Sequence, residues 1–218
     1  MSIREIERAT SARPDTVSRA TPRSQAQRRD EAERRILEAA ADIVAEDGLD
    51  GLTLANAGQR AGYSRGLPGH YFRSKDDLVS ALVRHIIDLF IAGRRALGQQ
   101  AGFEGLLATI EAYLELPLQR PKPVRAFHAV LAAALHAPEI AKAVADANRV
   151  SAHEIADAIR AGISSGEVRP DVDPDLEGVL ILAGLRGLVA QWLADPEGVD
   201  LPRLRRGFVA SLKRRLQP

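Results

Sequence analysis

Apolar side chains recur at helical spacing along most of the chain after residue 30. The first such segment places five of them on one face of a helix: Ile36, Leu37, Ala40, Ile43 and Val44. Glu and Arg residues occupy the opposite face, which is the pattern of an amphipathic surface helix. Gly48 follows at the position where helices most often end in a glycine. The pattern therefore predicts a first helix between residue 30 and Gly48.

Two short helices are predicted directly after it. Thr53 is a good N-cap for a helix from Leu54 to Ala61, and Gly62 sits where the chain must turn with a positive φ. Ser64 then offers a second N-cap, for a helix that runs to about Tyr71. The sequence thus predicts a short helix, a tight turn and a second short helix.

Helical spacing continues to the end of the chain. Ser74, with Asp77 three residues later, forms a capping-box pattern before a long apolar helix. Further helices are predicted near 103–116, 122–136, 138–165, 174–194 and 201–216. Alternating apolar runs beside tight hairpin turns, the signal of paired strands, are not evident, and no internal repeat is apparent. We therefore expect an all-α protein of about nine helices.

Composition and charge exclude several classes of protein. The 218 residues are 45% hydrophobic and 27% charged, which is ordinary for a globular chain with a core. The absence of cysteine excludes disulfides and thiolate metal sites and fits a cytoplasmic location. The longest apolar stretch, Val179 to Leu185, is far shorter than the ~18 residues of a membrane span, so no membrane contact is expected.

The chain divides into three parts. Residues 1–29 carry seven arginines against three acids and almost no large apolar residue, which indicates a basic arm without stable structure. The three acids argue against a transit peptide. Residues 30–74 hold the small three-helix unit, and residues 75–218 hold a larger helical bundle.

Two cations near helix starts point to an anionic partner. A helix followed by a Gly-containing turn and a second helix is the helix-turn-helix plan, whose second helix enters the DNA major groove. Arg65 and Lys75 stand at helix N-termini, where the helix dipole disfavours a cation. Their placement makes sense if a phosphate docks there. Otherwise both side chains simply point into water.

Residues 31–82 resemble the DNA-binding domain of TetR-type transcriptional regulators. The resemblance rests on four stretches: Ile36-Leu37-Glu-Ala-Ala, Gly48 with Leu52-Thr53, Ala61-Gly62-Tyr63-Ser64-Arg65-Gly66, and His70-Tyr71-Phe72-Arg-Ser74-Lys75-Asp-Asp-Leu78. It implies an N-terminal three-helix helix-turn-helix domain and a C-terminal bundle for ligand binding and dimerisation. It also implies a homodimeric repressor of palindromic double-stranded operator DNA, released by a small-molecule effector. Activation in place of repression stays open.

The resemblance assigns DNA contacts to a compact set of residues. Thr53, Ser64 and Lys75 would hold phosphate, and Arg65 would read guanine edges in the major groove. The full set is Thr53, Ser64, Arg65, Gly66, Leu67, His70, Tyr71 and Lys75. Phe72 is expected in the core. Arginines of the arm either follow the DNA backbone or minor groove, or belong to a solvated tail.

The sequence departs from the family pattern in the recognition helix. The family most often has Thr-Leu-Tyr where this chain has Leu67-Pro68-Gly69, and Gly66 and Gly69 lower helix propensity. Ala57 and Gly58 thin the core beneath the first short helix. Residues 30–82 also hold six basic against ten acidic side chains. The alternative function is therefore a ligand- or partner-binding module of the same fold that has lost operator recognition.

The C-terminal part supplies candidate interface and pocket residues. The segment 174–194 is apolar nearly all round, and 201–216 has one apolar stripe, which suits a two-fold four-helix interface. The expected dimer residues are Leu180, Gly184, Leu188, Leu204, Phe208 and Leu212; the alternative is that both helices pack within one monomer. The expected lining of an effector pocket for an apolar or amphipathic molecule is Tyr113, Arg125, Phe127, His128, His136 and Trp192.

Enzyme chemistry is not expected. His153-Glu154 and His136 with Glu139 resemble fragments of metal sites, but the chain has no HExxH motif, no Gly-rich phosphate loop and no convincing Ser-His-Asp arrangement. We therefore expect neither a catalytic residue, nor a metal, nor a cofactor.

Overall fold

The computed structural model describes residues 24–96 and 102–218, with side chains for 24–89 and 102–218, and divides the chain into two compact units, Met1–Ala32 and Glu33–Pro218. Every regular element in the described residues is a helix, as predicted. The elements are α1 (Gln25–Asp47), α2 (Leu54–Arg60), the 3-10 helix η1 (Leu67–His70), α3 (Lys75–Ala96), α4 (Gly102–Gln119), α5 (Pro121–Ala133), α6 (Pro138–Ser165), α7 (Pro174–Ala194) and α8 (Leu201–Leu216).

Helix α1 begins five residues before the predicted boundary. The hydroxyl of Ser24 accepts a hydrogen bond from the Gln27 N–H at 3.1 Å, and the Gln27 side chain accepts one from the Ser24 N–H at 2.9 Å. This reciprocal pair is a capping box, which starts a helix even in a segment poor in apolar residues. Residues 25–29 of the predicted arm are therefore helical, which corrects that part of the prediction, and residues 1–23 lie outside the described part of the chain.

Glycines end or turn the helices where the sequence indicated. Gly48 and Gly62 have φ values of +70° and +80°, the left-handed conformation that favours glycine. The later helices agree with their predicted ranges to within a few residues. Helix α4 differs from its prediction because it does not end before Pro117 but continues through it to Gln119. A proline at this place removes the N–H that would bond the carbonyl four residues earlier, so the last turn of α4 has one backbone hydrogen bond fewer, and the helix ends two residues later.

The buried side chains form two clusters. The first joins α1, α2 and α3 to α5 and the start of α6, and it includes Ile36, Leu52, Leu82 and Phe127. The second lies among α4, α6, α7 and α8 around Phe103, Ile159 and Leu212. Phe72 is 3% exposed and belongs to the first cluster, which confirms its expected place in the core. The three-helix unit predicted for residues 30–74, called the headpiece from here on, therefore shares one of the two cores with the bundle.

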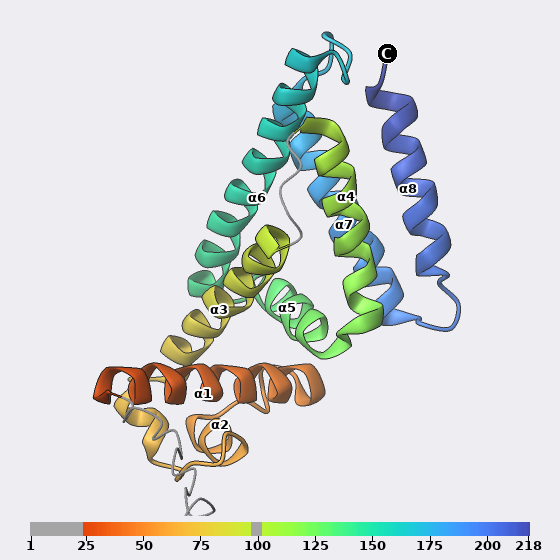
Figure 1. Ribbon diagram of the computed structural model, residues 1–218. Helices are drawn as coiled ribbons and strands as arrows, with labels where there is room; N and C mark the ends of the chain where they lie inside the picture. Colours follow the sequence, from red (N-terminus) through yellow and green to blue (C-terminus); the bar gives the residue numbers. More distant parts are fainter. Residues whose placement is uncertain (1–23, 97–101) are drawn as a thin grey trace, which may run out of the picture. The chain divides into compact units, whose positions relative to one another are not determined.

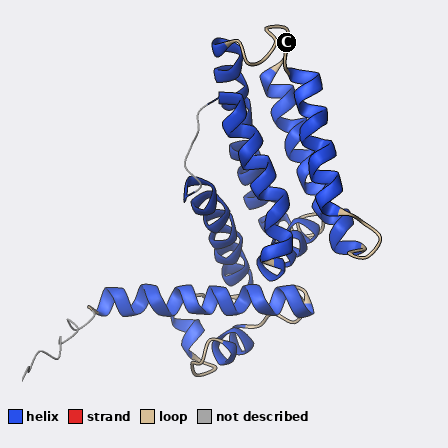
Figure 2. Cartoon of the chain, turned by 45° about the vertical axis from the view of Figure 1, so that its right-hand side comes forward, coloured by secondary structure: helices blue, strands red, loops and turns tan. Residues whose placement is uncertain are grey.

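The C-terminal helices form a bundle in which α4, α6, α7 and α8 run side by side (Figure 1, Figure 2). Gly178 lets α7 approach α6 closely, because a Cβ there would lie 2.4 Å from the Ala152 carbonyl oxygen. The close crossing fixes the register of the two helices, so that Arg186, about two turns further along α7, meets Asn148 of α6.

Helix α7 is long and apolar enough to cross a membrane by length and composition, contrary to our expectation for this chain. The sequence-based expectation considered only uninterrupted apolar residues. Helix α7 is apolar over its whole length although Glu177 and Arg186 interrupt it. Gly178, Ile181, Leu185 and Val189 pack into the bundle. A core helix with one apolar outer face meets the same criterion, so this feature is not evidence of a membrane.

Candidate nucleic-acid interface and ligand cavity

The first half of the helix-turn-helix has the predicted caps. The hydroxyl of Thr53 accepts a hydrogen bond from the Asn56 N–H at 3.0 Å, which closes the N-terminus of α2. At the other end the Tyr63 N–H bonds the Gly58 carbonyl oxygen across the left-handed Gly62. This is the arrangement that reverses a chain at a helix end. The turn therefore forms as its sequence predicts.

The second half differs from the prediction. A helix capped by Ser64 was expected, but the structure has a turn followed by a short 3-10 helix, η1. Pro68 explains the difference, because it has no N–H to donate to the Ser64 carbonyl, as an α-helix would require. The Leu67 N–H bonds that carbonyl at 3.2 Å instead. Bonds across three residues then continue through Gly69 and Tyr71, which is 3-10 geometry.

Gly58 and Pro68 fit each other across the turn. A Cβ on residue 58 would lie 2.8 Å from the Ser64 carbonyl oxygen and 2.9 Å from the Pro68 ring. Both residues are buried. The two departures from the family pattern therefore compensate: α2 loses a side chain where the proline ring occupies the space. The Pro68 ring fills the space at residue 58, so the expectation of a thinner core is corrected at this position.

The predicted DNA-contact residues occupy one exposed stretch of chain around η1. Thr53 is exposed at the start of α2, and Lys75 is exposed at the start of α3. Between them, Ser64, Arg65, Gly66 and His70 are exposed, while Leu67 and Tyr71 are half-buried. Arg73 is also exposed in this stretch. Sequence reasoning gave Arg73 no role, although its place between two assigned residues was the available signal.

The cations of the headpiece fall into two groups. Arg34 pairs with Glu38 along α1, and Arg60 of α2 pairs with Glu46 of α1 at 2.8 Å. By contrast Arg65, Arg73 and Lys75 make no ion pair with any described residue. Because the paired acids belong to α1, the unpaired positive charge is concentrated after residue 64. This distribution is what an acidic module needs in order to approach DNA.

The N-terminus of α3 is already hydrogen-bonded by its own side chains. The Ser74 hydroxyl accepts the Asp77 N–H at 3.1 Å, which confirms the predicted cap. The Asp77 carboxylate accepts the Arg73 N–H at 3.0 Å and adds a negative charge to this helix end. The backbone amides expected to hold phosphate are therefore partly occupied here. Any phosphate contact at this end rests on the Lys75 and Arg73 side chains.

Glu46 connects the headpiece to the bundle. Its two carboxylate oxygens accept hydrogen bonds from Arg60 of α2 at 2.8 Å and from Lys122 of α5 at 3.0 Å. These two hydrogen bonds lower the pKa of Glu46 to about 2. The carboxylate is thus charged at any physiological pH, and α1, α2 and α5 are held together by one group.

A cavity of about 430 Å³ lies among α3, α4, α5, α6 and α7. Its wall is mostly apolar, with Ile87, Ile110, Leu116, Ile155 and Leu185 among the lining residues. Polar groups are few, and they include Tyr113, Ser151 and Arg186. A mostly apolar cavity of a few hundred Å³ with a few polar groups is typical of a small-molecule site.

Two of the six expected pocket residues line this cavity, namely Tyr113 and Phe127. The other four do not. Arg125 and His136 are exposed, while Trp192 packs against the second core cluster. His128 is half-buried beside Phe127, whose ring it meets edge-on. Residue type alone could not distinguish these places, because the cavity is defined by helix register. Arg186 was missed for the same reason.

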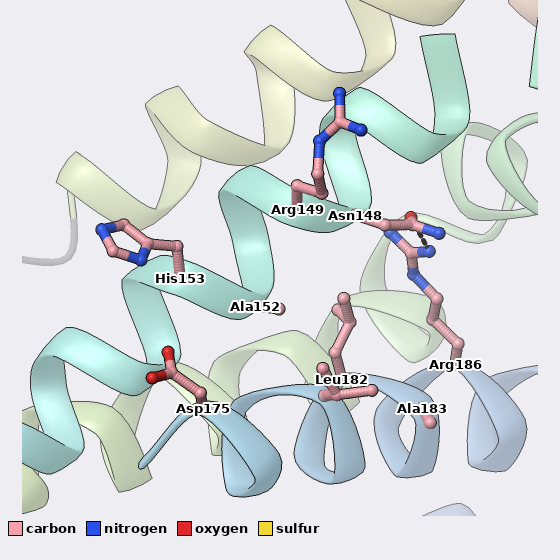
Figure 3. Close-up of a pocket in the computed structure, with 9 residues that line it drawn as sticks. Asn148, Arg149, Ala152, His153, Asp175, Leu182, Ala183 and Arg186 are labelled. Carbon is pink, nitrogen blue, oxygen red and sulfur yellow. Dashed lines mark hydrogen bonds between the residues drawn. The ribbon is translucent and has the colours of Figure 1, made fainter. Parts of the chain in front are cut away.

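Arg186 lies between the cavity and a groove on the outer side of α6 and α7. Figure 3 shows its guanidinium directed at Asn148, whose side-chain oxygen accepts its hydrogen bond. The outer groove, about 420 Å³, also contains His153 and Asp175 at its other end (Figure 3). Asp175 is exposed and pairs with Arg160. Since five helices contribute to the inner cavity and two to the groove, the inner cavity is the better candidate for a ligand site.

Burial of His128 predicts that the protein loses stability in mild acid. Burial, and to a smaller extent the charge of Arg186, lower the pKa of His128 from 6.5 to about 4. Because the folded pKa lies below the unfolded value, the unfolded chain binds the proton first as the pH falls. We expect the free energy of unfolding to decrease between pH 6.5 and 4, by up to about 1.4 kcal/mol per pH unit for this group.

Urea unfolding of the wild-type protein and His128→Leu at pH 7, 5.5 and 4.5 tests this expectation. The variant should have the shallower pH dependence. Burial also lowers the pKa of His85, so part of the slope should persist in the variant. Equal slopes in the two proteins would contradict the assignment to His128.

Most of the expected dimer residues pack within one chain. Phe208 lies against Gly184, where a Cβ would come within 2.9 Å of its ring, and Leu212 is 1% exposed. Leu188 packs against the second core cluster, and Leu204 is half-buried. Leu180 is 46% exposed, and Leu176 and Val179 beside it are also exposed. Among these residues and their described neighbours, the exposed apolar face is therefore the outer side of α7.

The described residues contain no group of three or more His, Asp or Glu side chains placed to hold a metal ion. His153, one of the suspected fragments, lies 3.4 Å from Asp157 on the same helix. His136 and Glu139 are both exposed. These fragments are ordinary surface positions.

Comparisons with known proteins match both parts of the chain. Residues 36–82 match the model of bacterial regulatory proteins of the tetR family, and residues 103–217 match the model of the BetI-type transcriptional repressor C-terminal region. The HTH-type transcriptional regulator BetI 1 of Chromohalobacter salexigens is 26% identical over 175 residues, which cover 79% of this chain and 84% of the relative.

Solved structures have the same fold. A putative TetR-family regulator from Rhodococcus sp. is 25% identical with a TM-score of 0.74, and the match covers 84% of this chain and 97% of that one. A putative transcriptional regulator from Saccharomonospora viridis, in complex with choline, is 24% identical with a TM-score of 0.73, covering 86% and 98% of the two chains.

Proposed function

The chain belongs to the TetR family of bacterial regulatory proteins, and from this premise we propose that it is a homodimeric repressor which binds a palindromic operator and leaves it when a small molecule binds. The observation that carries the proposal is the joint match of a DNA-binding model to the headpiece and a repressor model to the bundle. The proposed role is regulation of transcription in the cytoplasm, and no catalytic role is proposed.

The exposed cations support DNA as the partner of the headpiece. Arg65, Arg73 and Lys75 are exposed and make no ion pair with any described residue, whereas Arg34 and Arg60 are paired with acids of α1. Such side chains gain affinity by releasing counterions from the DNA backbone. Two headpieces related by two-fold symmetry would reach successive major grooves about 34 to 36 Å apart.

The proposal is tested by a mobility-shift measurement on DNA that flanks the protein's own gene. We expect a specific complex at protein concentrations that leave unrelated DNA of equal length unbound. The alternative, a module of this fold that has lost operator recognition, is favoured by the 3-10 geometry of η1. Binding to both DNAs with equal affinity would support that alternative and overturn the repressor proposal.

The outer face of α7 is the proposed dimer interface. Leu176, Val179 and Leu180 are exposed on it, and a contiguous apolar patch on a soluble protein commonly marks an interface. We expect Leu180→Asp to convert the dimer to a monomer, because an interface centre does not tolerate an unpaired charge. Sedimentation velocity measures the change. Leu135→Asp is the matched control, since Leu135 is 81% exposed but lies between α5 and α6.

If Leu180→Asp sediments as the wild-type protein does, the interface lies elsewhere. If the wild-type protein is itself a monomer, the homodimer proposal fails. The control variant should keep the wild-type sedimentation coefficient in either case.

A further inference from the structure

We propose that the cavity among α3–α7 takes a small amphipathic carboxylate, with Arg186 binding its head group and the apolar wall enclosing its tail. This inference rests on the proposed function, in which the bundle binds an effector. It adds the chemical class of that effector. The steps below concern the charge of Arg186, its neighbours, and the wall of the cavity.

Arg186 is a cation without an anion. It lies inward on α7 and lines the cavity, and no carboxylate of a described residue lies within ion-pairing distance of its guanidinium. Its one hydrogen-bond partner among the described residues is the neutral Asn148. The Nε–H is buried and has no hydrogen-bond partner within the part of the chain that the structure describes. A buried guanidinium with an unused donor is costly for a folded protein, and an anionic ligand would remove that cost.

The groups around Arg186 leave its charge uncompensated. Burial raises the pKa of Tyr113 to about 12, so its hydroxyl is neutral at physiological pH. His128 is neutral as well, because burial holds its pKa at about 4. Burial lowers the pKa of Arg186 itself, but from a value so high that the guanidinium keeps its proton. This region of the cavity is therefore positive.

The remaining charged groups of the cavity wall also favour an anionic ligand. Glu115 lines the cavity, but it pairs with Arg205 of α8. Arg120, at the start of α5, also lines the cavity and makes no ion pair with a described residue. Among its described residues, the wall thus offers two arginines that make no ion pair and one acid that is already paired. This balance of charges favours the binding of an anion and disfavours the binding of a cation.

The aromatic groups of the described residues at the cavity do not form a site for a cationic ligand. Quaternary ammonium ions are recognised by the faces of several aromatic rings. Here Arg186 itself lies over the Phe127 ring, 5.5 Å from its centroid. A ligand cation would have to approach that face beside a like charge. The arrangement holds the guanidinium over the ring and disfavours a cationic ligand at this face.

The rest of the wall suits an apolar tail. Ile87, Ile110, Leu116, Ile155 and Leu185 come from four helices and surround the space. A cavity of about 430 Å³ lies within the usual size range of ligand sites. A medium-length fatty acid has both required parts, one carboxylate and one apolar chain. Decanoate is therefore the probe.

The test is isothermal titration calorimetry of the dimeric wild-type protein with decanoate and with decyltrimethylammonium, which has the same tail and a cationic head. We expect decanoate to bind at least tenfold more tightly than the ammonium compound. Arg186→Gln should weaken decanoate binding roughly ten- to a hundredfold, the usual effect of losing a charge-assisted hydrogen-bonded pair. Arg149→Gln is the control, because Arg149 lies nearby on α6 with a side chain that is 76% exposed.

Equal binding of the two amphiphiles, or unchanged decanoate affinity in folded Arg186→Gln, would overturn the proposal. The comparison of the two head groups uses only the wild-type protein, so it tests the proposal even if the variant fails to fold. A parallel mobility-shift assay separates this inference from the proposed function. If decanoate binds through Arg186 but DNA stays bound, the carboxylate site stands and release by this ligand fails. If no DNA complex forms at all, the repressor proposal fails alone.

Discussion

Replacement of Arg65 by alanine is expected to weaken operator binding roughly ten- to a hundredfold at constant salt. Arg65 is exposed at the turn before η1, and it makes no ion pair within the described residues. A guanidinium that pairs bidentately with guanine contributes about 1–3 kcal/mol of discrimination, which corresponds to this range. Fluorescence anisotropy with a labelled operator measures the loss, and competition with substituted operators shows at which base pair specificity relaxes.

Lys75→Ala provides the contrast. Lys75 is exposed at the first position of α3, where it would hold a phosphate and not a base. Its loss should weaken binding to all sequences alike and lower the slope of log affinity against log salt by about one. Arg149→Ala, in the bundle, should change neither quantity. If Arg65→Ala binds operator as tightly as the wild type, Arg65 does not read a base.

The helices of this chain could be predicted because their signals are local. Amphipathic spacing, the Thr53 and Ser74 caps, and glycines at residues 48 and 62 act within a few residues of chain, and the structure confirms them. The exact form of the recognition segment could not be predicted. The lack of an N–H on Pro68 acts locally, but the fit of its ring against Gly58 of α2 is a contact between separate elements that residue spacing does not show.

The ligand cavity could be predicted only in part. Aromatic residues were reasonable candidates, and Tyr113 and Phe127 do line it. Arg186, the group with the clearest chemical role, looks in sequence like one polar position of an apolar helix. Its importance follows from the close approach of α6 and α7 and from the absence of a nearby carboxylate among the described residues. Both depend on contacts between residues far apart in the chain.

Helix α5 contacts both the cavity and the DNA-binding part. Phe127 lines the cavity beneath Arg186, and it also belongs to the core cluster that holds α1, α2 and α3 together. One and a half turns earlier, Lys122 pairs with Glu46 of α1. A ligand that displaces the Phe127 ring would therefore act directly on the packing of the headpiece. Helix α5 alone is enough to connect ligand binding in the cavity with a change in the spacing of the headpieces.

Gly58→Ala is expected to destabilise the protein by about 1–3 kcal/mol and to impair DNA binding, because it overpacks a rigid contact. The new Cβ would lie 2.8 Å from the Ser64 carbonyl oxygen and 2.9 Å from the Pro68 ring, and neither backbone nor ring can rotate away. The recognition segment must shift, and Arg65 shifts with it. Thermal unfolding and operator binding measure the two effects.

Gly69→Ala is the matched control, since a Cβ there meets no atom within 4 Å and the residue does not have a positive φ. This variant should melt at or above the wild-type temperature. Gly58→Ala combined with Pro68→Ala should recover only part of the loss, because removing the ring leaves the contact with the Ser64 carbonyl. A single Gly58→Ala variant with wild-type melting temperature and operator affinity would show that α2 and η1 are not packed against each other in this way.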